Sequence, residues 1–167
     1  MRYCCLSIPL ILLLSCSSNS SRNIIGVGQR IHHDDFEYSV TGFKVSKFQE
    51  NGSDTTRTGN FYCLVRFRVE NKALRVSHKW NNSIGYIIDE TGRIYENNPS
   101  LQQLLEKSQP FGYRDSYVTP AGSADSTCLA FELPSQVKRL FFKVRGEILM
   151  GDIFDRVRFR RMMVRLY

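Results

Sequence analysis

A cysteine behind a short apolar run is the first feature of this sequence that could do chemistry. Leu13-Leu14-Ser15-Cys16 places a small side chain directly before the thiol of Cys16. A signal peptidase needs such a small residue at its cleavage site, and the free thiol can accept a diacylglyceryl group. The apolar run, Leu6 to Leu14, follows the positively charged Arg2, which is the layout of a secretory signal. The sequence therefore predicts a signal peptide over residues 1–15 and lipid attachment at Cys16.

Two other interpretations of this N-terminal segment are an uncleaved membrane anchor and a secreted protein that is cut at another site. An anchor needs about 20 apolar residues, and this run is about half as long and contains Pro9. The layout resembles a bacterial lipobox, and acyl chains hold a protein on a membrane because each buried methylene contributes about 0.8 kcal/mol. We expect a protein anchored in the bacterial cell envelope, either to the outer face of the cytoplasmic membrane or to the outer membrane.

A cluster of arginines near the C-terminus is the second feature with chemical potential. The chain of 167 residues has a net charge of +7, and residues 138–167 alone carry +6, whereas residues 16–137 sum to zero. Arginines and apolar residues alternate around Val157 and Phe159, as they would in a strand with one basic face. The candidate anion-contacting residues are Arg156, Arg158, Arg160 and Arg161.

Two interpretations of this arginine stripe stay open. The structural one is the solvated face of an edge strand, where positive charge discourages pairing with other sheets. The functional one is an anion-binding surface, because the arginine fork matches phosphate and carboxylate groups. The extracytoplasmic compartment disfavours nucleic acid as the partner. Anionic lipid head groups, a cell-wall polymer or an acidic protein are the anions that we expect.

Histidines and acids could bind a metal ion, and cysteines could form a disulfide. His32-His33-Asp34-Asp35 is the densest group, but four consecutive side chains diverge and a metal needs three or four that converge. We therefore expect a polar turn and no metal, and we expect His78 to be solvated. Cys63 and Cys128 fall in opposite strand phases, which favours two free thiols over a disulfide.

Motifs of catalysis are missing from the sequence. It contains no Gly-x-Ser-x-Gly elbow, no His-Glu-x-x-His pair and no phosphate-binding loop. No cofactor is implied. Two alternatives to a binding module remain: a hydrolase of envelope polymers that uses scattered carboxylates, and a purely structural subunit of an envelope complex.

The elements that must position these residues are mainly short strands. Phe61 to Glu70 alternates strictly between apolar and polar residues, and Phe36 to Val45 alternates with one slip at Thr41-Gly42, which indicates a bulge. Further strands are expected over 29–31, 84–88, 93–95, 127–133 and 137–144. One helix is expected after Asn98, with Leu101, Leu104 and Leu105 on one face. Seven or so strands with turns between them predict a β-sandwich.

The order of several short landmarks supports this fold. They are Gly26-Val27-Gly28-Gln29, Tyr38-Ser39-Val40-Thr41-Gly42, Ile88-Asp89-Glu90-Thr91-Gly92-Arg93-Ile94-Tyr95, Pro120-Ala121-Gly122-Ser123 and Phe131-Glu132-Leu133-Pro134. This order resembles the telokin-like, immunoglobulin-like domain of unknown function that occurs in bacterial lipoproteins. The resemblance spans about residues 24–144 and implies an all-β, immunoglobulin-like, antiparallel β-sandwich with one short helix.

This resemblance bears on domain organisation and activity as well. We expect a serine-rich tether over residues 16–23 and a single domain over 24–167 with a basic C-terminal strand or tail. The resemblance supplies no catalytic or binding residues, and it implies a protein that is not an enzyme. Residues 97–118 and the tail after Arg145 depart from the family pattern, so the features particular to this protein are expected there.

Overall fold

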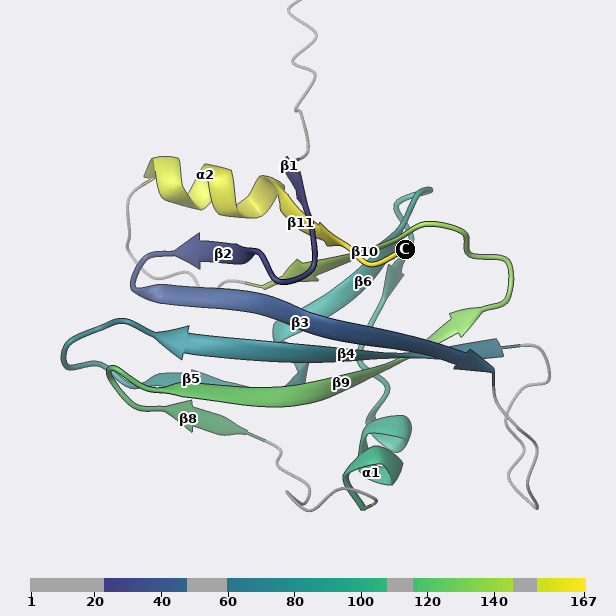
Figure 1. The fold of residues 1–167 in the computed structure, drawn as a ribbon, viewed down its shortest axis with the longest axis horizontal. Coiled ribbons are helices and arrows are strands. Elements are labelled where there is room, and N and C mark those ends of the chain that lie inside the picture. The colour runs from purple at the N-terminus through teal and green to yellow at the C-terminus, as the bar shows by residue number, and fades with distance from the viewer. Residues whose placement is uncertain (1–22, 48–59, 108–115, 146–152) are drawn as a thin grey trace, which may run out of the picture.

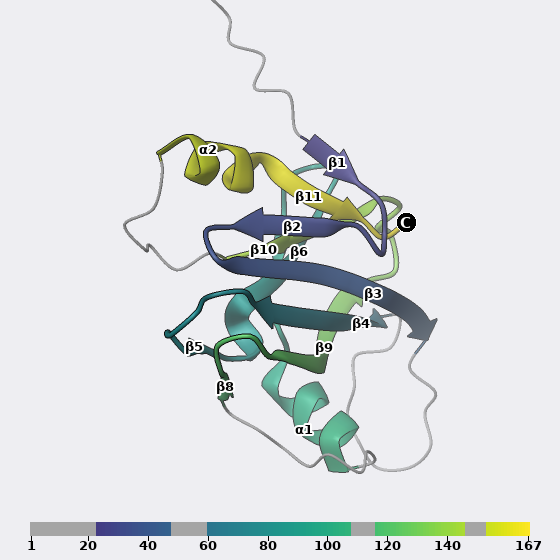
Figure 2. The same ribbon diagram turned by 60° about the vertical axis from the view of Figure 1, so that its left-hand side comes forward.

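The computed structural model describes residues 23–47, 60–107, 116–145 and 153–167. The predictions for the signal peptide and for Cys16 therefore lie outside the described residues, as does most of the serine-rich segment. Within the described ranges the chain forms two main β-sheets with a shared core, a smaller sheet and two α-helices (Figures 1 and 2). This is the expected β-sandwich.

The first main sheet has four antiparallel strands. In spatial order they are β2 (Arg30–His33), β3 (Phe36–Lys47), β4 (Asn60–Asn71) and β9 (Ala124–Pro134). β3, β4 and β9 are long and pair over most of their length. This sheet faces the viewer in Figure 1.

The second main sheet has five strands and is mixed. In spatial order they are β1 (Asn23–Ile25), β11 (Met162–Arg165), β10 (Leu140–Val144), β6 (Gly85–Asp89) and β7 (Ile94–Tyr95). The pair of β1 with β11 is parallel, whereas the other pairs of this sheet are antiparallel, so the expected antiparallel sandwich has one parallel pair at this edge. β1 was not predicted either, because three residues are too few to show a pattern.

A third sheet and a short helix close one end of the sandwich. Its two strands are β5 (His78–Trp80) and β8 (Tyr117–Thr119), and the 3-10 helix spans Asn82–Ile84. Trp80 stacks on Tyr117 at 4.0 Å between ring centroids and meets Phe67 of β4 edge-on. The third sheet is thereby joined to the main core.

Strand β4 confirms the clearest sequence pattern. Cys63, Val65, Phe67 and Val69 are buried, whereas Arg66 and its outward neighbours are not. The predicted bulge is present as well, because the pairing of β3 with β4 shifts between Val40 and Gly42. Alternation of apolar and polar residues along a strand arises when one face of the sheet is buried and the other is solvated, and β4 has both faces.

The predicted helix is present, with two of the three expected leucines, Leu101 and Leu105, half-buried. α1 spans Pro99–Lys107, and Asn98 Oδ1 accepts hydrogen bonds from the amides of Ser100 and Leu101, as an N-cap should. Leu104, however, is exposed, and the fully buried residue is Gln102. Polar contacts to a strand edge, described below, decide this orientation over the leucine stripe.

The C-terminal arginines lie mostly on a helix and not on the predicted strand. α2 spans Ile153–Arg161, and the strand β11 begins only at Met162. Arginine is a good helix former, and an alternation of five residues is too short to exclude a helix. The expectation of one helix and of a basic strand around Arg158 was therefore wrong.

Candidate anion-binding surface

Among the described side chains of helix α2, Phe159 is the one that attaches the helix to the sandwich. Phe159 is buried, with its ring centroid 4.2 Å from that of His33 and 6.1 Å from that of Tyr38. α2 therefore lies beside β2, as Figures 1 and 2 show. Because only Phe159 is buried in this turn, the neighbouring arginines must project into solvent.

Helix α2 carries all four of the arginines that the sequence suggested as anion contacts, and the structure describes the side chains of three of them. Arg158, Arg160 and Arg161 are exposed, and no ion pair is found for them within the described part of the chain. Arg156 belongs to the helix, but its side chain lies outside the described ones. We call the first three residues the α2 arginines.

The α2 arginines have a structural role that needs no ligand. All three lie in the last turn of the helix, where cations interact favourably with the negative end of the helix dipole. Lys143 Nζ donates to the carbonyl oxygen of Arg160 at 2.9 Å and so satisfies one of the terminal carbonyl groups. Helix stabilisation and anion binding are compatible, because the guanidinium groups themselves remain exposed.

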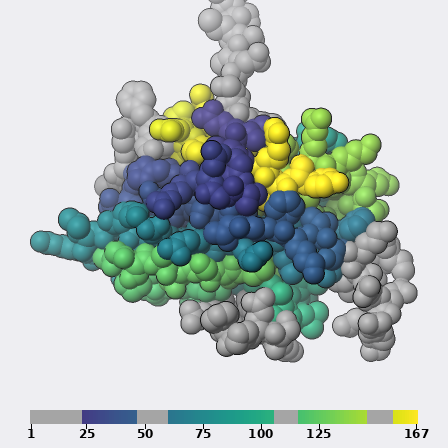
Figure 3. Space-filling view, in the orientation of Figure 1, coloured from purple at the N-terminus to yellow at the C-terminus, as the bar shows by residue number. Residues whose placement is uncertain are grey.

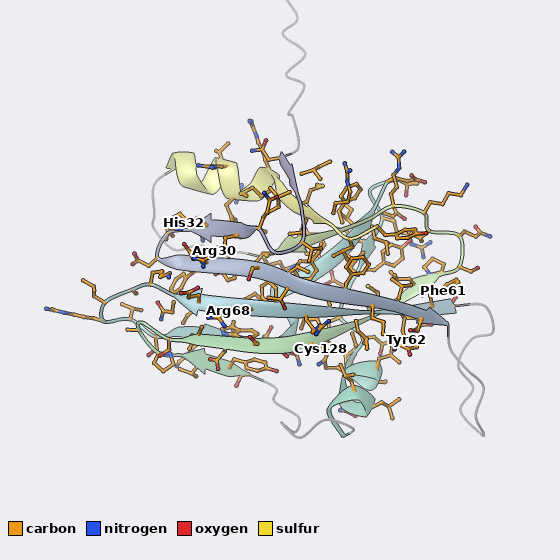
Figure 4. All side chains as sticks on the ribbon, viewed as in Figure 1. Arg30, His32, Phe61, Tyr62, Arg68 and Cys128 are labelled. Atoms are coloured by element: carbon orange, nitrogen blue, oxygen red, sulfur yellow. The ribbon has the colours of Figure 1, made fainter. Side chains whose placement is uncertain are left out.

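A second group of arginines lies on the outer face of the four-stranded sheet and was missed as a site. Arg30 of β2 is opposite Ser39, which is opposite Arg68 of β4, so these residues form one row across three strands. Arg66 precedes Arg68 by two residues and points to the same face. We call Arg30, Arg66 and Arg68 the sheet arginines; Figure 4 labels Arg30 and Arg68 on the face turned toward the viewer.

Only part of this charge is neutralised by nearby acids. Arg30 Nη1 lies 2.6 Å from Glu37 Oε2, and Lys72 Nζ lies 2.5 Å from Glu70 Oε1. The hydrogen bond from Lys72, helped by the charges of Lys72, Arg30 and Arg68, lowers the pKa of Glu70. Arg66 and Arg68 have no ion-pair partner among the described residues.

The bulge of β3 gives Arg66 its position. A Cβ atom at Gly42 would lie 3.1 Å from Arg66 Nη2, so the guanidinium group packs across the glycine. Thr41 and Ser126, both exposed, add hydroxyl groups beside the arginines. The outward phase of Arg66 and Arg68 was visible in the sequence, but their proximity to Arg30 depends on the strand pairing.

The histidine and acid candidates do not form a metal site. His33 is buried against Phe159, His32 is exposed, and Asp34 occupies a turn with φ of 50°. No cluster of three or more metal-ligating side chains occurs in the part of the chain that the structure describes.

His78 corrects a prediction, because it is buried and not solvated. Its ring stacks on Phe36 at 4.1 Å between centroids, and its Nε2 lies 3.1 Å from the hydroxyl oxygen of Tyr38. The flanking charges of Arg75 and Lys79 suggested a solvated loop. The pairing of β5 with β8 instead turns His78 toward the core.

The two described cysteines are free thiols on opposite faces of the four-stranded sheet. Cys63 is fully buried, and burial, reinforced by the nearby Cys128, raises its pKa to about 12. Cys128 is half-buried; burial raises its pKa, while the charge of Arg66 opposes that shift. Because the thiolate is the reactive form, neither thiol is activated.

Thiol labelling of the chain from Ser17 onward is expected to modify Cys128 slowly and to leave Cys63 untouched while the protein is folded. The measurement is the thiol titre with a chromogenic disulfide at mildly alkaline pH, with and without denaturant. The Cys128→Ala variant should show no reactive thiol until it is unfolded. Rapid native labelling of that variant would contradict the placement of Cys63 in the core.

None of the helices in the described residues is long and apolar enough to span a bilayer.

Two of the described acids have pKa values that depart clearly from the ordinary value. They are Glu70 and Asp89, and the pKa of each is lowered. For Asp89, burial alone would raise the pKa, but hydrogen bonds from Thr91, Tyr95 and the amide of Arg93 outweigh it.

The fold and these surfaces define the class of protein. It is a β-sandwich that exposes arginines on one sheet face and on helix α2. No protein-family model matches the chain, and no curated protein sequence matches it. Its similarity to solved structures is at the level of the fold.

Several bacterial proteins of known structure share this fold. The yjhA protein of Bacillus subtilis has 12% identity and a TM-score of 0.54, covering 87% of this chain and 99% of its own. An uncharacterized β-sandwich protein of Clostridium difficile has 13% identity and a TM-score of 0.52, covering 87% and 94%. A secreted protein of Mycobacterium tuberculosis, MPT63, has 12% identity and a TM-score of 0.51, covering 75% and 90%.

Proposed function

We propose that this protein is a non-enzymatic binding module of the bacterial cell envelope, anchored by a lipid on Cys16, and that its arginines contact an anionic envelope component. The observation that carries the proposal is that Arg66 and Arg68 lie exposed on the outer face of the four-stranded sheet without an ion pair to any described residue. Exposed guanidinium groups on neighbouring positions of a sheet can bind phosphate or carboxylate groups in pairs.

The α2 arginines lie on a helix that packs against β2. Since α2 packs against β2, and β2 carries Arg30, the two arginine groups belong to adjoining elements. A long anionic polymer or a charged lipid surface could contact both groups at once, and several weak contacts of this kind add up.

The extracytoplasmic location rests on the signal-peptide layout and on a fold that a secreted mycobacterial protein shares. A hydrolase is less well supported, because a general acid needs a raised pKa, whereas Glu70 and Asp89 have lowered ones. The buried histidines His33 and His78 pack against the rings of Phe159 and Phe36 in the core.

Neutralising two of the sheet arginines is expected to weaken binding to the anionic component about thirtyfold, because each basic residue near an anionic surface contributes about 1 kcal/mol. The variant is Arg66→Gln with Arg68→Gln in residues 17–167. Binding is measured by co-sedimentation with purified cell wall, phosphatidylglycerol vesicles and phosphatidylcholine vesicles over a salt series, since screening weakens exposed charge pairs.

A second variant tests the α2 arginines by changing Arg158, Arg160 and Arg161 to Gln. Point changes are needed here because deletion of the tail would remove β11, which pairs with β1 and β10. The matched control for the sheet variant is Lys138→Gln with Arg139→Gln, which removes the same two positive charges from the loop between β9 and β10. The proposal is wrong if wild type binds no anionic surface, or if the control weakens binding as much as the sheet variant.

A further inference from the structure

The segment between β4 and β5 exposes aliphatic side chains at a projecting tip. Leu74 is 94% exposed, more than any other large apolar residue of the described chain, and Val76 is 63% exposed. Val118, opposite Lys79 in the adjoining strand β8, is 53% exposed. We call Leu74, Val76 and Val118 the apolar tip; the teal segment at the left of Figure 3 is where this β4–β5 turn projects.

This exposure is imposed by hydrogen bonds at the base of the segment. The buried side chain of Asn71 donates from Nδ2 to the carbonyl oxygens of Val76, at 2.7 Å, and Thr119, at 3.0 Å. Its Oδ1 accepts from the amide of Ala73 at 3.0 Å. Ala73 and His78 are buried on the two sides of the tip, so the residues between them are held outward.

The charges around the tip are mostly basic. Arg75 and Lys79 are exposed and have no ion pair within the described residues, and no acid occurs in the sequence from 71 to 88. The acids nearby lie at its base: Lys72 pairs with Glu70, and its amide donates to the carbonyl of Asp35.

We propose that the apolar tip inserts into the head-group region of an anionic lipid bilayer, with Arg75 and Lys79 contacting lipid phosphates. A convex tip with three aliphatic side chains is too small for a stable protein interface, which buries about 1,200 Å² or more. A bilayer interface accepts single aliphatic side chains, and long basic side chains beside them reach the phosphates.

This insertion goes beyond the proposed function, because it needs neither the sheet arginines nor the α2 arginines. It gives the domain a second, non-covalent contact with the membrane. Together with the lipid on Cys16, such a contact would restrict the orientation of the domain, since two linked attachments act at high effective concentration.

The test uses residues 17–167 and vesicles of phosphatidylglycerol and phosphatidylcholine. Leu74→Ser with Val76→Ser is expected to weaken vesicle binding about tenfold, because each aliphatic side chain loses its transfer from water. The matched control, Leu104→Ser, removes an exposed leucine on α1 and should bind as wild type does. Thermal unfolding should be unchanged in both variants, since all three side chains are exposed.

A spectroscopic readout locates the tip directly. In Leu74→Trp, the new indole should be quenched by brominated lipids, whereas wild-type fluorescence should not, because Trp80 is buried. Absence of quenching, or equal vesicle binding by wild type and the double serine variant, would overturn the proposal. Binding that is lost only in the arginine variants would overturn the insertion and leave the proposed function intact.

Discussion

Replacing Gln102 with leucine is expected to lower the free energy of unfolding by about 3 kcal/mol, because it leaves buried backbone groups without partners. Gln102 Nε2 donates to the carbonyl oxygen of Cys128 at 2.7 Å, and its Oε1 accepts from the amide of Ala130 at 2.9 Å. Both backbone groups belong to the outer edge of β9. The side chain therefore takes the place of a neighbouring strand.

The same edge receives two further contacts from the chain before α1. Asn97 Nδ2 donates to the carbonyl oxygen of Ala130 at 3.1 Å, and the amide of Asn98 donates to the same oxygen at 2.8 Å. Unpaired strand edges promote aggregation, so the leucine variant should also aggregate more readily when heated.

The measurement is urea unfolding followed by circular dichroism, with light scattering on heating. Gln103→Leu is the matched control, since Gln103 is exposed on the same helix and should change stability by less than about 0.5 kcal/mol. If Gln102→Leu were as stable as this control, β9 would not depend on the side chain for its edge.

Gly85→Ala is the second change with a large expected effect, a loss of about 3 kcal/mol from overpacking. A Cβ atom at Gly85 would lie 2.1 Å from Cζ of Phe142, and that ring is fully buried between the sheets. The backbone at Gly85 is extended, with φ of −134°, so any residue could adopt it. The whole penalty therefore comes from the ring.

A double-mutant cycle tests this cause. Phe142→Leu shortens the side chain, and the double variant should be more stable than the sum of the single effects by about 1 kcal/mol or more, because the two sites share one space. Gly42→Ala is the control: its Cβ would meet only the movable Arg66 side chain, at 3.1 Å. Additive effects of Gly85→Ala and Phe142→Leu would contradict the proposed clash.

Local patterns in the sequence predicted the parts of the fold that depend on neighbouring residues. The alternation of β4 and the bulge beside Gly42 were visible because strand periodicity is local. The N-cap at Asn98 was equally visible, since it involves only the next three residues.

Predictions from the sequence were wrong where a contact between residues far apart in the chain outweighs the local pattern. The arginines around Phe159 form a helix because that ring packs on His33, more than a hundred residues earlier. His78 is buried by Phe36 and Tyr38, although its neighbours in sequence are basic. α1 buries Gln102 and leaves Leu104 exposed, because β9 has an open edge there.

For function, the sequence by itself determined the signal-peptide layout, the β-sandwich pattern and the excess of C-terminal charge. The tertiary structure alone decided which charges adjoin: strand pairing placed Arg30 in one row with Arg68, and helix packing placed the α2 arginines beside β2. It also decided that Leu74 is exposed, through the hydrogen bonds of Asn71. The physical reason is that a charged or apolar surface is a property of positions in space, and pairing between residues far apart in the chain sets those positions.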